Sequence, residues 1–280
     1  RHYPKTCKSF LQDSNPLMPE SCFIRSNLFA EHGLNGVFSL RSGGSSEPPF
    51  DSLNLADDTG DDKTVVEQNM ATLMHAAGLS ARTHRARQVH GIAVLSCSGP
   101  GIMHHQEADI LCSHDGAPLA VRTADCTPVL LADRRSGALA TAHAGWRGSA
   151  RGAVTQALKA LQTTGSRPED ILAAIGPCIG PCCFEIGREA ADALSSSCAE
   201  AAAYVTQRHT STYADLASIN RLQLLHSGVD AGHIDMLRDY TMFQEKHACT
   251  CCQARYFFSY RRDGIKSGRH LAIVAPMSSA

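Results

Sequence analysis

The sequence predicts an α+β fold in which mixed β-sheets are sandwiched between helices within a single domain. Of its 280 residues, 43% are hydrophobic and 19% are charged, enough apolar material for one large core or two modest ones. Strand-like and helix-like segments follow one another without a strict β–α–β alternation, which disfavours a doubly wound parallel sheet. No internal repeat divides the chain, so we expect one domain.

The N-terminal segment is expected to lie outside this domain. Residues 1–22 contain prolines and little hydrophobic periodicity, a pattern typical of a tail or a loosely docked segment. We therefore predict a tail over 1–22 and a folded domain over 23–280. Within that domain, residues 41–62 are rich in Gly, Ser and Pro. A stretch this long is a candidate binding loop, although its composition fits an ordinary surface loop equally well.

The middle of the chain predicts a helix, a pair of strands and a second helix. Apolar residues recur at helical spacing from 62 to 79, and Gly78 stands where a helix would end. Between 118 and 143, two β-rich runs flank the turn residues 134–137 and predict paired strands. Residues 149–163 place apolar side chains on one face and predict a helix that starts directly after the motif GWRG.

The C-terminal half is predicted to continue this irregular order. A Cys- and Gly-rich turn follows the next strand, and the turn-prone residues 261–268 separate the last two strand-like runs. The predicted elements are a strand at 171–175, helices near 187–197 and 213–227, and strands at 256–260 and 270–276.

Charge and hydropathy exclude several classes of function. The formal net charge is -1 and the basic residues are spread along the chain, so we expect no binding to nucleic acid or anionic membranes. No apolar run reaches the roughly 20 residues of a membrane span, and the first residues lack the apolar core of a secretion signal. We predict a cytoplasmic protein with a small-molecule ligand, whose 12 cysteines stay reduced. The oligomeric state stays open.

Three β-like runs each deliver a metal-binding residue at the end. They are ARQVHG with His90, RTADCTP with Cys126 and TAHAGWRG with His143. Two imidazoles and one thiolate suit Zn²⁺, and three protein ligands leave a fourth position open, as catalytic zinc requires. The spacing matches no local zinc signature, so core or turn histidines and a small buried cysteine remain the ordinary interpretation of each residue alone.

Five motifs, in order, resemble the YfiH-type laccase-domain family. They are QVHG, TADCTPVLLAD, AHAGWRG, IGPCIGPCC and FFSYRRDG. The segments SLNLADDTGDD and SINRLQLLHSGV also resemble the family, so the similarity extends from about Gly33 to the C-terminus.

The resemblance implies a metal held by His90, Cys126 and His143. It also implies phosphorolysis of adenosine, inosine and methylthioadenosine, together with adenosine deamination; an older description of the family is polyphenol oxidase or laccase. Water activated by zinc could attack C6 of adenine. Phosphorolysis instead requires phosphate beside the ribose and therefore cationic side chains near the metal.

Arg147 is the first candidate for phosphate binding. It follows His143 by four residues in the GWRG turn, where a guanidinium and unpaired backbone N–H groups favour an anion. Arg41 and Arg261 are the next candidates for substrate binding, and Arg262 is more simply a surface arginine.

Two further side chains are candidates for contacts with the nucleoside. Asn54 could hydrogen-bond the ribose or base, or simply form an Asx turn. Trp146, the only tryptophan, could stack on a purine or pack behind the metal turn.

Two other activities compete with nucleoside phosphorolysis. The same three ligands suit copper, which would make the chain a polyphenol oxidase, although the HxH pairs of multicopper oxidases are absent from the sequence. Alternatively, Cys126 and His143 could act without metal as nucleophile and base of an amidase. Family members have also been linked to editing of peptidoglycan precursors, which would suit such an amidase.

The remaining cysteines are expected to carry no chemistry. Cys249 and Cys252 form a CxxC pair, but no second pair is well placed in the sequence, so buried reduced thiols are the favoured interpretation. Cys178, Cys182 and Cys183 lie in the predicted turn and are assigned no role.

Overall fold

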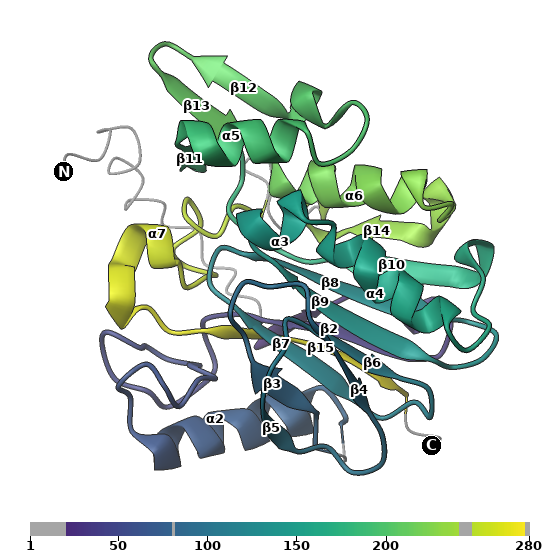
Figure 1. Cartoon of the computed structure of the whole chain (residues 1–280). Helices are drawn as coiled ribbons and strands as arrows, with labels where there is room; N and C mark the ends of the chain where they lie inside the picture. Colours follow the sequence, from purple (N-terminus) through teal and green to yellow (C-terminus); the bar gives the residue numbers. More distant parts are fainter. Residues whose placement is uncertain (1–20, 80–81, 241–247, 278–280) are drawn as a thin grey trace.

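The computed structural model describes residues 21–79, 82–240 and 248–277 and has four layers (Figure 1). Helix α2 (Lys63–Ala76) covers one face of a four-stranded sheet, and the other face of that sheet packs on a six-stranded sheet. Helices α4 (Ala153–Gln162) and α6 (Leu216–His226) cover the outer face of the six-stranded sheet. The predicted α+β fold, with sheets between helices, is confirmed.

The six-stranded sheet has the order β14-β10-β8-β9-β6-β4. Its four inner strands pair antiparallel, whereas β14 and β4 join the two edges in parallel. The strands are β4 (Val94–Cys97), β6 (Ile110–Ser113), β8 (Thr127–Asp133), β9 (Leu139–Ala144), β10 (Ile171–Ile175) and β14 (Ile234–Met236).

The four-stranded sheet is entirely antiparallel, with the order β1-β2-β15-β7. The last strand of the chain therefore lies between two strands from the first half. The strands are β1 (Phe23–Arg25), β2 (Leu34–Ser39), β7 (Leu119–Thr123) and β15 (His270–Pro276).

Alternating side chains of β8 separate two hydrophobic cores. Val129 and Leu131 pack toward α4 and α6, whereas Leu130 and Ala132 pack between the two sheets. Successive side chains of a strand point to opposite faces, and β8 is buried on both. This double burial explains the uninterrupted apolar run PVLLA in the sequence.

A smaller lobe extends from the main body (Figure 1). It contains the sheet β11-β13-β12, with α5 (Arg188–Ser195) packed against it. A separate parallel pair, β3 (Arg85–Arg87) and β5 (Met103–Glu107), lies near β7. The lobe strands are β11 (Glu185–Ile186), β12 (Val205–Arg208) and β13 (Ser211–Ala214); the remaining short helices are α1 (Asn27–Glu31), α3 (Trp146–Ala150) and α7 (Tyr260–Asp263).

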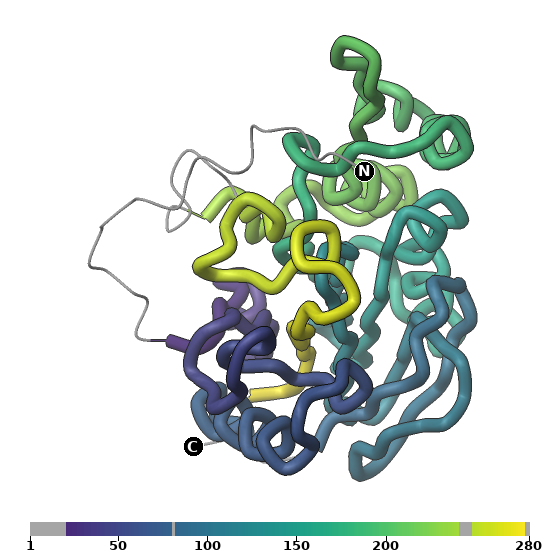
Figure 2. Tube along the Cα trace, turned by 90° about the vertical axis from the view of Figure 1, so that its left-hand side faces the viewer, coloured from purple at the N-terminus to yellow at the C-terminus, as the bar shows by residue number. Residues whose placement is uncertain are grey.

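The Gly-rich loop 41–62 has no helix or strand and packs beside the C-terminal segment (Figure 2). The backbone N–H of Arg41 donates to the carbonyl of Tyr256 at 2.8 Å, and that of Leu55 donates to the carbonyl of Arg269 at 3.1 Å. Two segments more than 200 residues apart thus form one surface.

Several predicted elements are confirmed. The Asp62 carboxylate caps the N-terminus of α2, and Gly78 follows that helix with φ +69°. Strand β10 and helices α5 and α6 also lie where they were predicted, with shorter helices than expected. Nearly all of the predicted tail lies outside the described residues. Among the described residues, no helix combines the length and apolar character needed to span a bilayer.

Two local predictions are confirmed only in part. The strands predicted to pair around residues 134–137 are β8 and β9, but the run 118–133 is two strands, because the chain turns at Asp125 (φ 91°) and passes from one sheet to the other. The helix predicted over 149–163 is α4, with its apolar face buried as expected, but it begins only after Gly152 (φ 74°), and a separate short helix, α3, covers the GWRG motif.

The strand predicted at 256–260 is absent. Phe257 and Phe258 are both buried, so their side chains do not alternate between core and solvent. The N–H of Phe258 donates to Nε2 of His270 rather than to a neighbouring strand, and Ser259 then caps α7. Side-chain hydrogen bonds replace the strand ladder here.

Candidate metal centre

The structure brings His90, Cys126 and His143 together from three separate segments. His90 lies in the turn after β3, Cys126 in the break between β7 and β8, and His143 near the end of β9. One possible ligand atom from each residue lies within 4.8 Å of the others. The β8–β9 ladder, which pairs Pro128 with His143, places the end of β9 beside the chain that follows Cys126.

The Asp109 carboxylate organises two of these residues. It accepts a hydrogen bond from Nδ1 of His143 at 2.7 Å and from the backbone N–H groups of residues 89, 90 and 91 at 2.7 to 3.1 Å. A proton held on Nδ1 leaves Nε2 of His143 as the donor atom for a metal. The sequence offered no signal for Asp109, because its partners lie 18 to 34 residues away.

The charges of Cys126 and His143 stabilise one another. Burial would raise the pKa of Cys126, but the charge of His143 and hydrogen bonds from His143 and His90 outweigh burial and lower this pKa to about 6. Burial would lower the pKa of His143, but the charge of Cys126 and the hydrogen bond with Asp109 raise it to about 9. Cys126 is therefore a thiolate near neutral pH, the form in which cysteine binds metals or attacks carbonyls.

Gly145 allows the three side chains to approach closely. A Cβ atom at this position would lie 2.9 Å from Sγ of Cys126 and 3.1 Å from Cδ2 of His90. No larger residue fits without displacing these groups. On the other side, His90 is exposed, so the cluster is open to solvent.

Asp125 connects the centre to the C-terminal segment. Its carboxylate accepts hydrogen bonds from the hydroxyls of Thr250 at 2.6 Å and Ser259 at 3.0 Å, and from the backbone N–H of Arg261 at 2.6 Å. The residue directly before Cys126 therefore fixes the position of the motif FFSYRRDG.

Arg147 lies in α3, which follows His143 closely in the chain. Its side chain is exposed, and its guanidinium carbon lies 4.2 Å from the centroid of the Trp146 ring. It forms no ion pair with another described residue. Trp146 is half-buried and packs against the hydrophobic cluster of the lobe. Its stacking on a purine stays a prediction.

The other predicted substrate-binding residues are engaged in structural contacts. Arg41 forms an ion pair with Asp51 at 2.9 Å and donates to the carbonyl of Ala254. Asn54 is fully buried, and its side-chain amide bonds Ala56, Thr59, Asp61 and the N–H of Arg269. As substrate ligands, both stay predictions.

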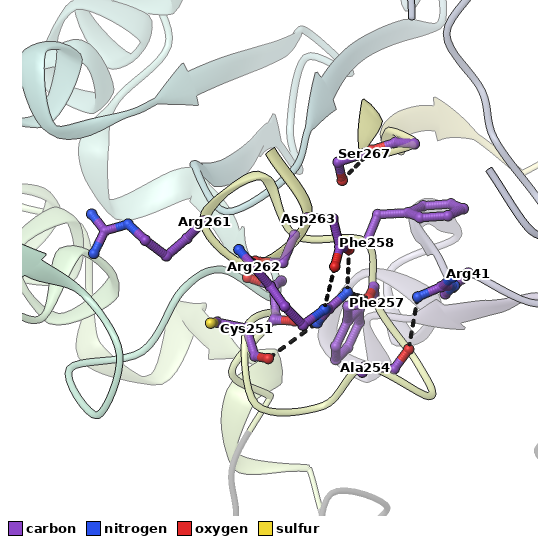
Figure 3. A network of polar contacts seen from close by, with 12 residues as sticks. Arg41, Cys251, Ala254, Phe257, Phe258, Arg261, Arg262, Asp263 and Ser267 are labelled. Atoms are coloured by element: carbon purple, nitrogen blue, oxygen red, sulfur yellow. Dashed lines mark hydrogen bonds and ion pairs between the residues drawn. The ribbon is translucent and has the colours of Figure 1, made fainter. Parts of the chain in front are cut away.

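The two arginines of SYRRDG point in different directions (Figure 3). Arg261 donates to the carbonyls of Cys183 and Glu185, and its contact with substrate stays a prediction. Arg262 donates to the carbonyls of Thr250, Cys251 and Phe257 and pairs with Asp263 at 2.7 Å. Arg262 therefore stabilises the backbone around it and is not simply a surface arginine.

A cavity of about 580 Å³ lies in the lobe, between the sheet and α5. None of the predicted site residues lines it. The structure also contradicts the expectation that no second cysteine pair is well placed: Cys182 and Cys183 lie beside Cys249 and Cys252.

Sequence comparisons connect this geometry to known proteins. A family model described as "Multi-copper polyphenol oxidoreductase laccase" matches residues 35–276. "Purine nucleoside phosphorylase YfiH" of Escherichia coli is 36% identical over 231 residues, which cover 82% of this chain and 89% of that protein. "Purine nucleoside phosphorylase" of Deinococcus radiodurans is 36% identical over 240 residues, covering 85% and 87%.

Solved structures share the fold. The crystal structure of YlmD from Geobacillus stearothermophilus superposes with a TM-score of 0.80 at 31% identity, covering 94% of this chain and 98% of that one. Protein NMB0706 from Neisseria meningitidis superposes with a TM-score of 0.76 at 30% identity, covering 92% and 100%. The similarity therefore covers the whole domain.

Proposed function

The chain belongs to the family described as multi-copper polyphenol oxidoreductase laccase, and we propose that it is a zinc-dependent purine nucleoside phosphorylase. Its relatives in Escherichia coli and Deinococcus radiodurans carry the phosphorylase name. The proposed substrates are adenosine, inosine and methylthioadenosine with inorganic phosphate, and adenosine deamination is a second proposed activity. The observation that carries the proposal is the convergence of His90, Cys126 and His143 in a solvent-open cluster.

The donor set of this cluster fits zinc. Two imidazoles and one thiolate are ligands that Zn²⁺ accepts in tetrahedral sites, and a three-residue set leaves one position for a reactant. The hydrogen bond from His143 to Asp109 is the outer contact that orients metal-bound histidines. The lowered pKa of Cys126 supplies the required thiolate.

His90, Cys126 and His143 would hold the ion, and the remaining residues would bind and orient the substrates. When bound, zinc would supply a Lewis acid that stabilises negative charge and acidifies water. Arg147 is proposed to bind phosphate, because its guanidinium is exposed and forms no ion pair with described residues. Charge-assisted hydrogen bonds from Arg147 would orient the attacking phosphate oxygen toward the anomeric carbon of the ribose.

Product analysis tests this proposal. Purified protein is incubated with adenosine, inosine or methylthioadenosine, with and without phosphate, and the products are identified by mass. Phosphorolysis predicts free base and ribose 1-phosphate (or its methylthio analogue) only when phosphate is present. Deamination predicts inosine from adenosine in either case.

A copper-dependent polyphenol oxidase is the first competing function, and the description of the family favours it. The HxH pairs of multicopper oxidases are absent from the sequence, and within the described ranges no candidate ligand group contains more than two histidines. We therefore rank this function second. Metal analysis of protein made without added metal, with phenol oxidation and nucleoside cleavage assayed in parallel, separates the two functions.

A metal-independent amidase acting on peptidoglycan precursors is the other competitor. The observation in its favour is the chain of contacts from the Cys126 thiolate through His143 to Asp109, the order of nucleophile, base and orienting carboxylate in thiol hydrolases. An amidase would survive chelators and form an acyl-thioester on Cys126. A zinc enzyme would do neither.

A further inference from the structure

Two further groups of candidate metal ligands among the described residues lie outside the site described above. One consists of His84, Cys97 and His104, and the other consists only of thiols. The thiol cluster contains Cys182 and Cys183, from the turn after β10, and Cys249 and Cys252, from the segment before α7. Nearly 70 residues separate the two pairs in the sequence. Cys249 is buried, Cys183 is half-buried, and Cys182 and Cys252 are exposed, so the cluster is open to ions from one side.

The spacing of the sulfur atoms suits a tetrahedral ion. All four lie within 4.8 Å of one another; Cys182 Sγ is 3.4 Å and Cys183 Sγ is 3.1 Å from Cys252 Sγ. Four sulfurs around one zinc at about 2.3 Å would lie roughly 3.8 Å apart. At 3.4 Å and 3.1 Å, neither Cys182 nor Cys183 forms a disulfide with Cys252, because bonded sulfurs are about 2.05 Å apart.

Backbone hydrogen bonds hold the two segments in this arrangement. The N–H of Gly180 donates to Sγ of Cys249 at 3.2 Å, and that of Thr250 donates to the carbonyl of Cys178 at 3.1 Å. A backbone bridge also joins Cys178 to Cys249. The first of these bonds places a donor on a sulfur atom, a contact that stabilises a thiolate more than a thiol.

We propose that Cys182, Cys183, Cys249 and Cys252 form a second, structural metal site that binds Zn²⁺. Four thiolates in a closed tetrahedral set are typical of structural zinc. The ion would join the turn after β10 to the C-terminal segment. Those two segments also hold Arg261, through the carbonyl of Cys183, and the Thr250 hydroxyl that contacts Asp125.

The surrounding chain supports a structural role. Arg262 donates to the carbonyl of Cys251 (Figure 3) and to that of Thr250. Both residues lie in the same turn as Cys249 and Cys252. The Arg262 guanidinium and the cysteine cluster therefore both stabilise this turn. The proposed ion would connect this turn to Cys182 and Cys183, and the hydrogen bond from Thr250 to Asp125 connects the turn to the first site.

Zinc counting in variants of the full chain tests the proposal independently of activity. We expect two zinc ions per chain in the unsubstituted protein, one in Cys126→Ala and one in the double variant Cys249→Ser/Cys252→Ser. Cys198→Ser, which removes a thiol from the lobe that belongs to no candidate ligand group, should keep two. If the unsubstituted protein keeps one zinc and Cys126→Ala keeps none, the second site is refuted.

X-ray absorption at the zinc edge keeps the test decisive if the double variant fails to fold. Cys126→Ala loses a ligand of the first site and keeps all four cysteines of the proposed site, so its zinc should show a single shell of sulfur at about 2.3 Å. Nitrogen or oxygen neighbours at about 2.0 Å, iron in place of zinc, or a disulfide joining the two segments in anaerobically purified protein would each overturn the assignment. One zinc in the unsubstituted protein that persists in Cys126→Ala with an all-sulfur shell would instead support this site and refute the catalytic one.

Discussion

The buried carboxylate of Asp109 accepts a hydrogen bond from Nδ1 of His143 at 2.7 Å. The same carboxylate accepts the N–H of His90 at 2.9 Å and those of the residues on either side of it. A single side chain therefore fixes the imidazole of one proposed metal ligand and the turn that carries another.

Asp109→Asn should weaken zinc binding at the first site by about 10- to 100-fold, the usual effect of losing such an outer contact. The amide cannot accept all the hydrogen bonds that the carboxylate accepts. Competition with a chelator measures the affinity. Asp133→Asn is the control. Asp133 is as buried as Asp109 but lies at the opposite end of β8 from Cys126, where its carboxylate accepts hydrogen bonds from Arg135 and Ser136 in the turn that follows. A folded Asp109→Asn variant with unchanged zinc affinity would contradict the orienting role.

Arg147→Ala should raise the KM for phosphate and slow phosphorolysis by about 10-fold or more, since a charge-assisted hydrogen bond contributes ~1.5–3 kcal/mol. Zinc content should not change, and adenosine deamination, which uses water, should fall much less. Arg151→Ala is the matched control, because Arg151 is an exposed arginine at the end of the same helix. Equal losses in both reactions with a lower Tm would show that Arg147 instead stabilises the turn.

Gly145→Ala should reduce zinc content by displacing Cys126 and His90, because the added Cβ would lie 2.9 Å from the Cys126 sulfur. The measurement is zinc per folded chain after gel filtration. Gly187→Ala adds the same methyl group where no atom lies within 4 Å and should be silent. Full zinc occupancy in Gly145→Ala would show that the three side chains are not held as tightly as the structure indicates.

Alkylation of the metal-free protein tests the thiolate of Cys126. With its pKa lowered to about 6, its reaction with iodoacetamide should rise with a midpoint near pH 6, whereas an ordinary thiol has its midpoint near about 8.5. Asp109→Asn removes a group that raises the pKa of His143, so less positive charge faces the thiolate and the midpoint should move upward. Peptide mass spectrometry follows Cys126 and, in the same sample, Cys198, whose pKa is raised by burial. An ordinary midpoint at Cys126 would refute the pairing with His143.

The parts of the fold that were predicted correctly are those governed by local sequence. The α2 helix has a helical apolar pattern between Asp62 and Gly78, and β10 is a short apolar run, so neighbouring residues determine both. The break at Asp125 was missed because a long-range network of hydroxyl and N–H donors holds its left-handed conformation. The buried residues Phe257 and Phe258 resemble a strand in sequence. The backbone N–H of Phe258, however, donates to the side chain of His270 in β15 and not to a neighbouring strand.

The candidate site divides in the same way. Each proposed ligand of the first site lies within a recognisable motif. The partners of Asp109 lie far apart along the chain, as do the two cysteine pairs, and each set comes together only in the folded chain. Spacing rules for cysteine compare neighbouring pairs, so an adjacent Cys182–Cys183 and a distant Cys249–Cys252 gave no recognisable signature.

Phosphate-dependent cleavage of inosine tests the central claim most directly, because inosine has no amino group to lose and deamination cannot contribute. The measurement is ribose 1-phosphate formed by zinc-loaded protein and by Cys126→Ala, with the zinc content of each determined on the same preparation. We expect steady formation of ribose 1-phosphate by the unsubstituted protein, none without phosphate, and none from a folded Cys126→Ala variant that has lost the first zinc. Equal formation of ribose 1-phosphate by that variant, or none by the zinc-loaded unsubstituted protein, would contradict this claim.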